Sequence, residues 1–192
     1  MKGQSEPVTV YTIGHGSRSI SEFIALLVES GVQRLVDVRR WPSSRRHPQF
    51  SREALGNSLA GAHIRYVWEG ETLGGRRRPT PTSPHIALRD EMFRGYADHM
   101  LTAGFLAVLR VLIDTSCSEP TAIMCAERLP QRCHRSLISD NLCIRGIEVK
   151  HIVEPGTVRA HTIDNRARRV GDTLIYDRGH QPALGGTDGK GE

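Results

Sequence analysis

The feature of this sequence that most constrains its fold is an alternation of short apolar runs with segments of helical periodicity. The runs are rich in β-branched and aromatic residues, which is typical of strands, and lie at residues 8–14, 34–41, 64–68, 122–125 and 148–153. Apolar spacing predicts helices at residues 19–31, 51–62, 105–113 and about 131–145, and Ser19 and Ser51 are the expected N-caps of the first two. The alternation predicts an α/β fold: a mostly parallel five-stranded sheet with helices on both faces.

Length and composition predict one domain followed by a C-terminal extension. A chain of 192 residues with 38% hydrophobic content can bury one core, which we assign to residues 1–156. Residues 157–192 are first basic and then glycine-rich, which favours a small hairpin within 158–176 and disorder after it. Segment 69–94 lacks periodicity and is rich in arginine and proline, so it is either a mobile basic flap over the site or disordered.

The distribution of apolar residues and cysteines indicates the cellular compartment in which we expect the protein. No apolar run approaches the roughly 20 residues that span a bilayer. The N-terminus also lacks the apolar core of a signal peptide, so we expect a cytoplasmic protein with no membrane partner. In a reducing compartment the four cysteines, Cys117, Cys125, Cys133 and Cys143, are expected to be thiols or metal ligands.

The arginine content predicts an anionic partner. The formal net charge is +5, and arginines cluster at residues 39–40, 45–46, 76–78 and 166–169. A guanidinium group donates two parallel hydrogen bonds to a phosphate or carboxylate, so an anionic small molecule and a nucleic acid are both candidate partners. The alternative is that these arginines are solvated surface residues.

The strongest candidate for a functional site lies between residues 121 and 135. The fourth apolar run leads into Cys125 and Glu127, and Cys133, His134 and Arg135 follow at the start of the next predicted helix. Open α/β sheets bind ligands at the carboxyl ends of their strands, so these side chains are expected to face a ligand. The alternative is that Cys125 is a small buried hydrophobe and the arginines are solvated.

Two earlier strand ends and one helix carry further candidates. Gly14 and His15 form a glycine turn before a helix N-terminus, which favours an anion, although a backbone partner for His15 is an equal alternative. Asp37 lies in an apolar run and needs a partner, for which Arg39 is the nearest cation; a structural ion pair is the alternative to catalysis. Tyr96 is expected either to face the site or to lie in the core.

The first functional hypothesis is an enzyme, a hydrolase or transferase acting on a phosphorylated, nucleotide or nucleic-acid substrate. Its catalytic groups are Cys125 as nucleophile, or Glu127 and His134 as acid–base groups, with Asp37 as a partner. The residues expected to bind the substrate are Gly14, His15, Arg39, Arg45, Arg46, Tyr96, Cys133 and Arg135.

Two other hypotheses remain open. One is a non-catalytic nucleic-acid-binding module, in which basic segments contact phosphates while Trp41 or another aromatic residue stacks on bases. The other is a zinc-binding domain using Cys125, Cys133 and His134. It is disfavoured because adjacent side chains on a helix point in different directions and the usual paired spacings are absent. The sequence identifies no cofactor and no oligomeric state.

Several motifs in the chain together resemble one known family. They include Thr12-Ile-Gly-His-Gly-Ser-Arg18, Leu35-Val-Asp-Val-Arg39, Cys125-Ala-Glu127 and Cys133-His-Arg135. In this order they are similar to the signature of the bacterial and archaeal domain of unknown function 488, over roughly residues 8–155. The resemblance implies an α/β domain and supports the positions of the motif residues, but it implies no particular reaction.

Overall fold

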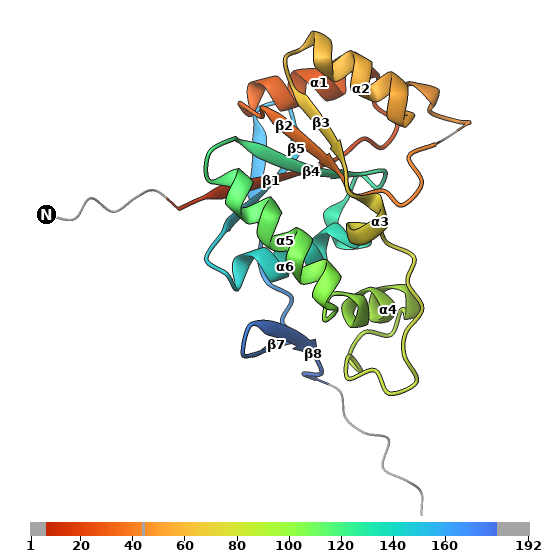
Figure 1. The fold of residues 1–192 in the computed structure, drawn as a ribbon, viewed down its shortest axis with the longest axis vertical. Coiled ribbons are helices and arrows are strands. Elements are labelled where there is room, and N and C mark those ends of the chain that lie inside the picture. The colour runs from red at the N-terminus through yellow and green to blue at the C-terminus, as the bar shows by residue number, and fades with distance from the viewer. Residues whose placement is uncertain (1–6, 44, 180–192) are drawn as a thin grey trace, which may run out of the picture.

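A six-stranded sheet forms the centre of the computed structural model, which describes residues 7–43 and 45–179 (Figure 1). The strand order is β3-β2-β4-β1-β5-β6, and the first five are mutually parallel. The bounds are β1 Thr9–Gly14, β2 Arg34–Asp37, β3 Arg65–Trp68, β4 Thr121–Cys125, β5 Glu148–Glu154 and β6 Thr157–Ala160. The predicted α/β class and the mostly parallel sheet are confirmed.

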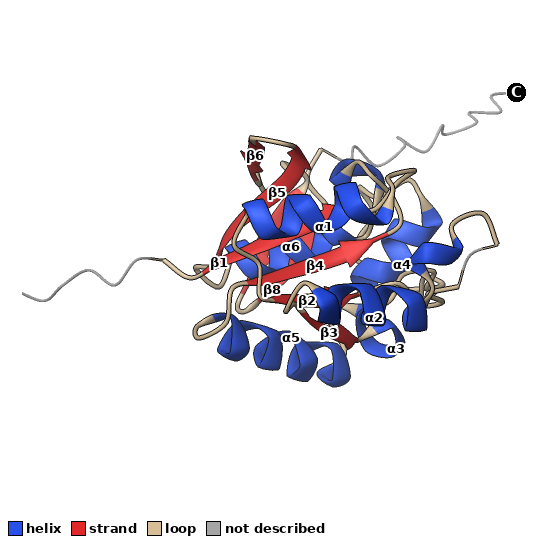
Figure 2. Cartoon of the chain, turned by 90° about the horizontal axis from the view of Figure 1, so that it is seen from above, coloured by secondary structure: helices blue, strands red, loops and turns tan. Residues whose placement is uncertain are grey.

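Helices cover both faces of this sheet, as expected from the alternation of elements (Figure 2). Helices α1 and α2 lie on one face and α5 and α6 on the other (Figure 1). The α-helices are α1 Ile20–Glu29, α2 Arg52–Gly61, α3 Gly70–Leu73, α4 Glu91–His99, α5 Ala103–Ser116 and α6 Arg135–Cys143. Short 3-10 helices, η1 Pro48–Phe50 and η2 Pro130–Arg132, precede α2 and α6.

Local capping explains where two of the helices begin. Ser19 caps α1 through a capping box, in which its side chain accepts a hydrogen bond from the backbone of Glu22 and the Glu22 carboxylate accepts one from the Ser19 backbone. Ser51 caps α2 by accepting from the Ala54 backbone. Both caps were predicted, because they depend only on residues three positions apart.

The region after residue 156 differs from the sequence prediction. A sixth strand, β6, pairs antiparallel with β5, so residues 157–160 extend the main sheet. A hairpin does form, but only from β7 Ala167–Val170 and β8 Thr173–Tyr176. Leu174 and Tyr176 of this hairpin are buried in the core that contains α5 and α6. The predicted disorder of the final residues, 180–192, lies outside the described residues.

Segment 69–94 is packed against the domain rather than forming the predicted mobile flap. It contains α3 and the start of α4, and its side chains Leu73, His85 and Leu88 are buried. The Arg77 guanidinium donates to the Gly74 carbonyl, which fixes the chain after α3. The Ala87 backbone NH donates to the Tyr176 carbonyl over 2.9 Å. Because these two residues lie far apart in sequence, local periodicity could not predict this contact.

No single helix among the described residues is long and apolar enough to cross a bilayer. Taken together, α4 (Glu91–His99) and α5 (Ala103–Ser116) reach the length and apolar composition of a membrane span, but the two helices are bent by 77° relative to each other.

Candidate functional site

The carboxyl ends of three neighbouring strands bring together segments that are remote in sequence. Strand β4 lies between β1 and β2, with Gly14 beside Cys125 and Asp37 beside Met124. The backbone NH of His15 donates to the Cys125 carbonyl over 3.1 Å, which extends the pairing into the loops. The Asp37 strand end and the Cys125 strand end therefore meet at one edge of the sheet, where ligands of open α/β sheets bind.

Asp37 and Arg39 form a buried ion pair at this edge. Arg39 Nε donates to Asp37 Oδ1 over 2.9 Å and Arg39 Nη2 donates to Oδ2 over 2.6 Å. The Tyr66 hydroxyl donates to the same Oδ2 over 2.7 Å. Burial alone would lower the pKa of Arg39, but the Asp37 carboxylate raises it above its ordinary value. Both oxygens of Asp37 are thus occupied, which favours a structural role over a catalytic one.

His15 packs against this ion pair as a neutral ring. Burial and the Arg39 charge lower the pKa of His15 to about 4. Its ring stacks on Phe50 at 4.2 Å between centroids, and Nδ1 lies 2.9 Å from the Gly16 carbonyl. A neutral ring that donates from Nδ1 presents the lone pair of Nε2 to Arg39 Nη1, 3.4 Å away. His15 therefore helps to hold Arg39 in place.

Cys125, Cys133 and His134 converge beside the pair, and with Arg135 we call them the thiol centre. One potential ligand atom from each of the first three lies within 4.8 Å of the others. His134 Nδ1 is 3.6 Å from the Cys133 sulfur, while Nε2 is 3.1 Å from the Val38 carbonyl. Because a carbonyl can only accept, His134 Nε2 carries a proton and donates to Val38. Nδ1 therefore faces the thiols, where it can accept the proton of Cys133.

The two thiols are not equivalent. The hydrogen bond with Cys133, together with burial, raises the pKa of Cys125. The hydrogen bond from Cys125 lowers the pKa of Cys133, and His134 and Arg135 lower it further. The two thiols titrate as a pair, and Cys133 is the one that ionises first, with Cys125 donating to it. The sequence prediction placed the nucleophile at Cys125, whereas the directions of these pKa shifts favour Cys133.

Arg135 is a buried cation at the thiol centre, with 1% of its surface exposed. It donates from Nη1 to the Thr12 hydroxyl over 3.2 Å and from Nη2 to the Glu127 carbonyl, while its Nε has no partner. No ion pair joins it to a carboxylate within the described residues. An uncompensated buried guanidinium stabilises a nearby anion, so Arg135 favours ionisation of the Cys133 thiol and lowers its pKa.

The helix that follows begins later than predicted, which determines how these side chains lie. Residues 130–132 form a 3-10 turn, Cys133 is extended (φ −138°, ψ 145°), and α6 starts only at Arg135. Cys133 and His134 are therefore not consecutive residues of a helix. The argument that adjacent helical side chains point in different directions is therefore removed, and with Cys125 the two residues could hold a metal ion in a three-ligand site.

The remaining predicted site residues divide between the centre and the surface. Tyr96 is buried, donates from its hydroxyl to the Leu73 carbonyl over 2.7 Å, and lies 4.9 Å from the His134 ring. Glu127 is exposed, and one of its carboxylate oxygens accepts from the Leu129 backbone at 3.3 Å. Arg45 and Arg46 are exposed in the loop after β2.

A basic and aromatic surface adjoins the thiol centre, and we call Arg40, Trp41 and Arg76 the basic rim. The guanidinium carbons of Arg40 and Arg76 lie 5.2 and 5.5 Å from the centre of the Trp41 ring, which is 58% exposed. The Gly74-Gly75 segment connects the two regions. A methyl group at Gly74 would lie 2.9 Å from the Arg40 backbone, and one at Gly75 would lie 2.9 Å from His134 Nδ1.

Sequence reasoning did not assign Arg40 and Arg76 to the site, although both belong to arginine clusters that it had noted. The missing information was the close approach of the Gly74-Gly75 backbone. Only glycine permits such an approach, so the glycine pair was the available signal.

Comparison with known proteins gives one result. Residues 19–142 match the family described as Domain of unknown function DUF488. No curated protein and no solved structure gives a significant match.

Proposed function

Because this match spans most of its length, the chain belongs to the DUF488 family, and from that premise and the geometry we propose that it is a thiol-dependent enzyme acting on an anionic substrate. The observation that carries the proposal is the position of the Cys133 sulfur. It lies between the Cys125 thiol, the His134 ring and the Arg135 guanidinium, at the carboxyl edge of the sheet.

The residues of the thiol centre divide the chemical roles between them. Cys133 is the nucleophile, since a thiolate attacks an electrophilic phosphorus or carbon far faster than a thiol does. His134 accepts a proton at Nδ1, and Cys125 donates a hydrogen bond that holds Cys133 ionised. Arg135 stabilises the negative charge at the sulfur and, in the reaction, on the substrate.

The basic rim supports a nucleotide or nucleic acid as the substrate class. Arg40 and Arg76 supply positive charge for phosphates, and the exposed ring of Trp41 offers a face on which a base can stack. The Gly74-Gly75 segment places this surface next to His134, so a bound nucleotide would lie beside the thiol centre.

Ionisation of Cys133 can be tested without knowing the substrate. Thiolates absorb in the far ultraviolet, so a pH titration of the folded protein is expected to show one thiol ionising well below the ordinary value of about 8.5. The low-pH step should disappear in Cys133→Ser and persist in Cys117→Ser, since Cys117 is exposed and outside the centre. A step that survives in Cys133→Ser would assign the thiolate elsewhere.

The basic rim makes a separate prediction for binding. Trp41→Ala is expected to weaken binding of a short single-stranded oligonucleotide by about 1–3 kcal/mol, the usual contribution of one stacked base. Fluorescence anisotropy at fixed salt measures this loss. Val111→Ala is the control, because Val111 is also 58% exposed but lies on α5. If Trp41→Ala and Val111→Ala bound the oligonucleotide with equal affinity, the basic rim would not be the binding surface.

A non-catalytic nucleic-acid-binding module is a second candidate, favoured by the same rim. The two differ in the effect of Cys133→Ser, which should abolish turnover of an enzyme while leaving oligonucleotide binding intact. We expect a thermal-shift screen of nucleotides, sugar phosphates and oligonucleotides to supply the substrate for that assay, because ligands stabilise the folded state. Binding without turnover of any hit would favour the module.

Zinc binding is the third candidate, favoured by one hydrogen bond. Metal-binding histidines usually donate their second ring NH to a carbonyl or carboxylate, and His134 Nε2 faces the Val38 carbonyl in this way. Elemental analysis of the purified protein distinguishes a zinc site from a metal-free thiolate. A stoichiometric amount of zinc that is lost in Cys133→Ser would favour the metal site.

A further inference from the structure

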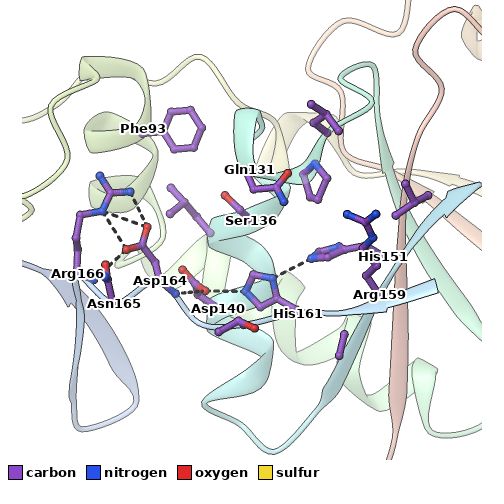
Figure 3. A pocket seen from close by; sticks show the side chains of 16 residues that line it. Phe93, Gln131, Ser136, Asp140, His151, Arg159, His161, Asp164, Asn165 and Arg166 are labelled. Atoms are coloured by element: carbon purple, nitrogen blue, oxygen red, sulfur yellow. Dashed lines mark hydrogen bonds and ion pairs between the residues drawn. The ribbon is translucent and has the colours of Figure 1, made fainter. Parts of the chain in front are cut away.

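A cavity separate from the thiol centre lies between α6, β5 and the strand and loop that follow (Figure 3). Its volume is about 610 Å³, within the range of small-molecule sites. Apolar side chains form part of its wall, and polar side chains from α6, β5, β6 and residues 161–166 form the rest. The residues that matter to its chemistry are Gln131, Asp140, His151, Arg159, His161 and Asn165.

A directed chain of hydrogen bonds runs behind one wall of the cavity. Arg135 can only donate, so the Thr12 hydroxyl accepts from it and gives its own proton to His151 Nδ1, 2.7 Å away. A neutral His151 then carries its proton on Nε2, which donates to His161 Nδ1 over 2.9 Å. Burial is the largest cause that lowers the pKa of His151 to about 4, and its neighbours His161 and Arg135 act in the same direction, in agreement with a neutral ring.

The chain ends on a buried carboxylate. His161 Nε2 donates to Asp140 Oδ1 over 2.7 Å, and the Tyr176 hydroxyl donates to Oδ2 over 2.8 Å (Figure 3 shows the histidine links). The chain thus begins at the Arg135 cation and ends at the Asp140 anion, with every intermediate donor and acceptor used. The wall is fixed in one arrangement and has no unsatisfied charge of its own.

One charged side chain of the lining has no partner within the described part of the chain. Asp164 pairs with Arg166 at 2.6 Å, so these two cancel. Arg159 has no hydrogen bond or ion pair within the described part of the chain. It lies directly opposite His151 in the β5–β6 pair, and opposite residues of an antiparallel pair share one face, which directs Arg159 toward the cavity.

Uncommitted hydrogen-bonding groups and an apolar surface complete the lining. The side-chain amides of Gln131 and Asn165 have no partner among the described residues and border the cavity. Phe93, Leu129 and Leu137 provide the apolar part. One cation, two free amides and an apolar wall together suit a ligand that has a single anionic group on a small, partly apolar body.

We propose that this cavity is a second binding site, which takes a small organic anion with a single carboxylate or phosphate group that pairs with Arg159 and with an apolar body that lies against Phe93 and Leu137. A carboxylate and a phosphate share this chemistry, because the oxygens of either group accept hydrogen bonds from a guanidinium. Recognition by Arg159 adds charge-assisted hydrogen bonds, and the prearranged histidine wall needs no reorganisation when the ligand enters. The proposal concerns binding and stands independently of any thiol chemistry.

Calorimetric titration of the full chain with phenyl phosphate, benzoate and neutral benzamide tests the site. At least one of the two anions is expected to bind in the millimolar range or tighter, and benzamide at least about tenfold more weakly. The stronger of the two anions identifies the headgroup. Absence of binding by both anions at millimolar concentration would overturn the proposal.

Four variants locate the binding. Arg159→Gln is expected to weaken the anion by about tenfold, and Ala160→Trp to abolish binding by filling the space. Both residues are exposed on the edge strand β6, so the fold should tolerate the changes. Arg110→Gln makes the same charge change on α5 and should have no effect. Binding that survives Arg159→Gln and Ala160→Trp but is lost in Trp41→Ala would place the anion at the basic rim and refute the cavity site.

Discussion

A single methyl group at Gly14 is expected to destabilise the protein by at least about 3 kcal/mol, at the upper end of the effects of overpacking. The Cβ of an alanine there would lie 1.9 Å from the Glu127 carbonyl oxygen and 2.8 Å from the Arg128 Cα. Both contacts are with backbone, so no side chain can rotate away. Relief would require the loop after β4 to separate from the end of β1.

The same change should also disturb the thiol centre. The Glu127 carbonyl that Gly14→Ala would displace accepts a hydrogen bond from Arg135, the cation beside Cys133. Urea unfolding measures the loss of stability, and the thiolate titration measures the effect on Cys133. Gly104→Ala in α5 is the matched control. Nothing lies within 4 Å of its added Cβ, so it should be neutral or stabilise the helix by up to about 1 kcal/mol. Equal stabilities of the two variants would show that the β1 and β4 ends are not in contact.

Replacing Asp37 with alanine is expected to reduce the free energy of unfolding by about 3–5 kcal/mol, the usual effect of breaking a buried ion pair. The Asp37 side chain is fully buried and that of Arg39 is 7% exposed. Asp37→Ala would leave the Arg39 guanidinium buried without its carboxylate and would remove the acceptor of the Tyr66 hydroxyl. Urea unfolding at neutral pH measures the change.

A double-mutant cycle separates the lost pair from other effects of the substitution. Arg39→Met in the Asp37→Ala background removes the unpaired charge while keeping much of the side-chain volume, so it should restore part of the stability. If the double variant were less stable than Asp37→Ala, the uncompensated charge would not be the cause. A change below about 0.5 kcal/mol in Asp37→Ala, typical of exposed sites, would contradict the buried pair altogether.

Part of the candidate site could be predicted from residue types alone. The strand ends at Gly14, Asp37 and Cys125 were identified, because glycine turns, a charge within an apolar run and a strand-end thiol are local patterns. Which of the two thiols ionises first could not be predicted from the sequence. It depends on which sulfur receives the hydrogen bond, and the spacing of Cys125 and Cys133 says nothing about that direction.

Other parts of the site and of the second cavity were not predicted, for a related reason. Arg45 and Arg46 resemble anion-binding residues by composition, but they are exposed, whereas Arg135 gains its significance from burial without a carboxylate. His151 and His161 have no distinguishing local context. They become a hydrogen-bonded pair only because β6 returns along β5 and the chain after it passes over α6.

The sequence by itself determined the order of the five parallel strands and of helices α1, α2, α5 and α6, the caps at Ser19 and Ser51, and the family, because each of these is specified by side chains in short ordered stretches of the chain. Tertiary structure decided that β4 is inserted between β1 and β2, which brings Asp37, Cys125 and Gly14 to one edge. It also decided which charges are buried and which groups share protons. These properties depend on desolvation and on hydrogen bonds between residues as much as 139 positions apart, such as Thr12 and His151.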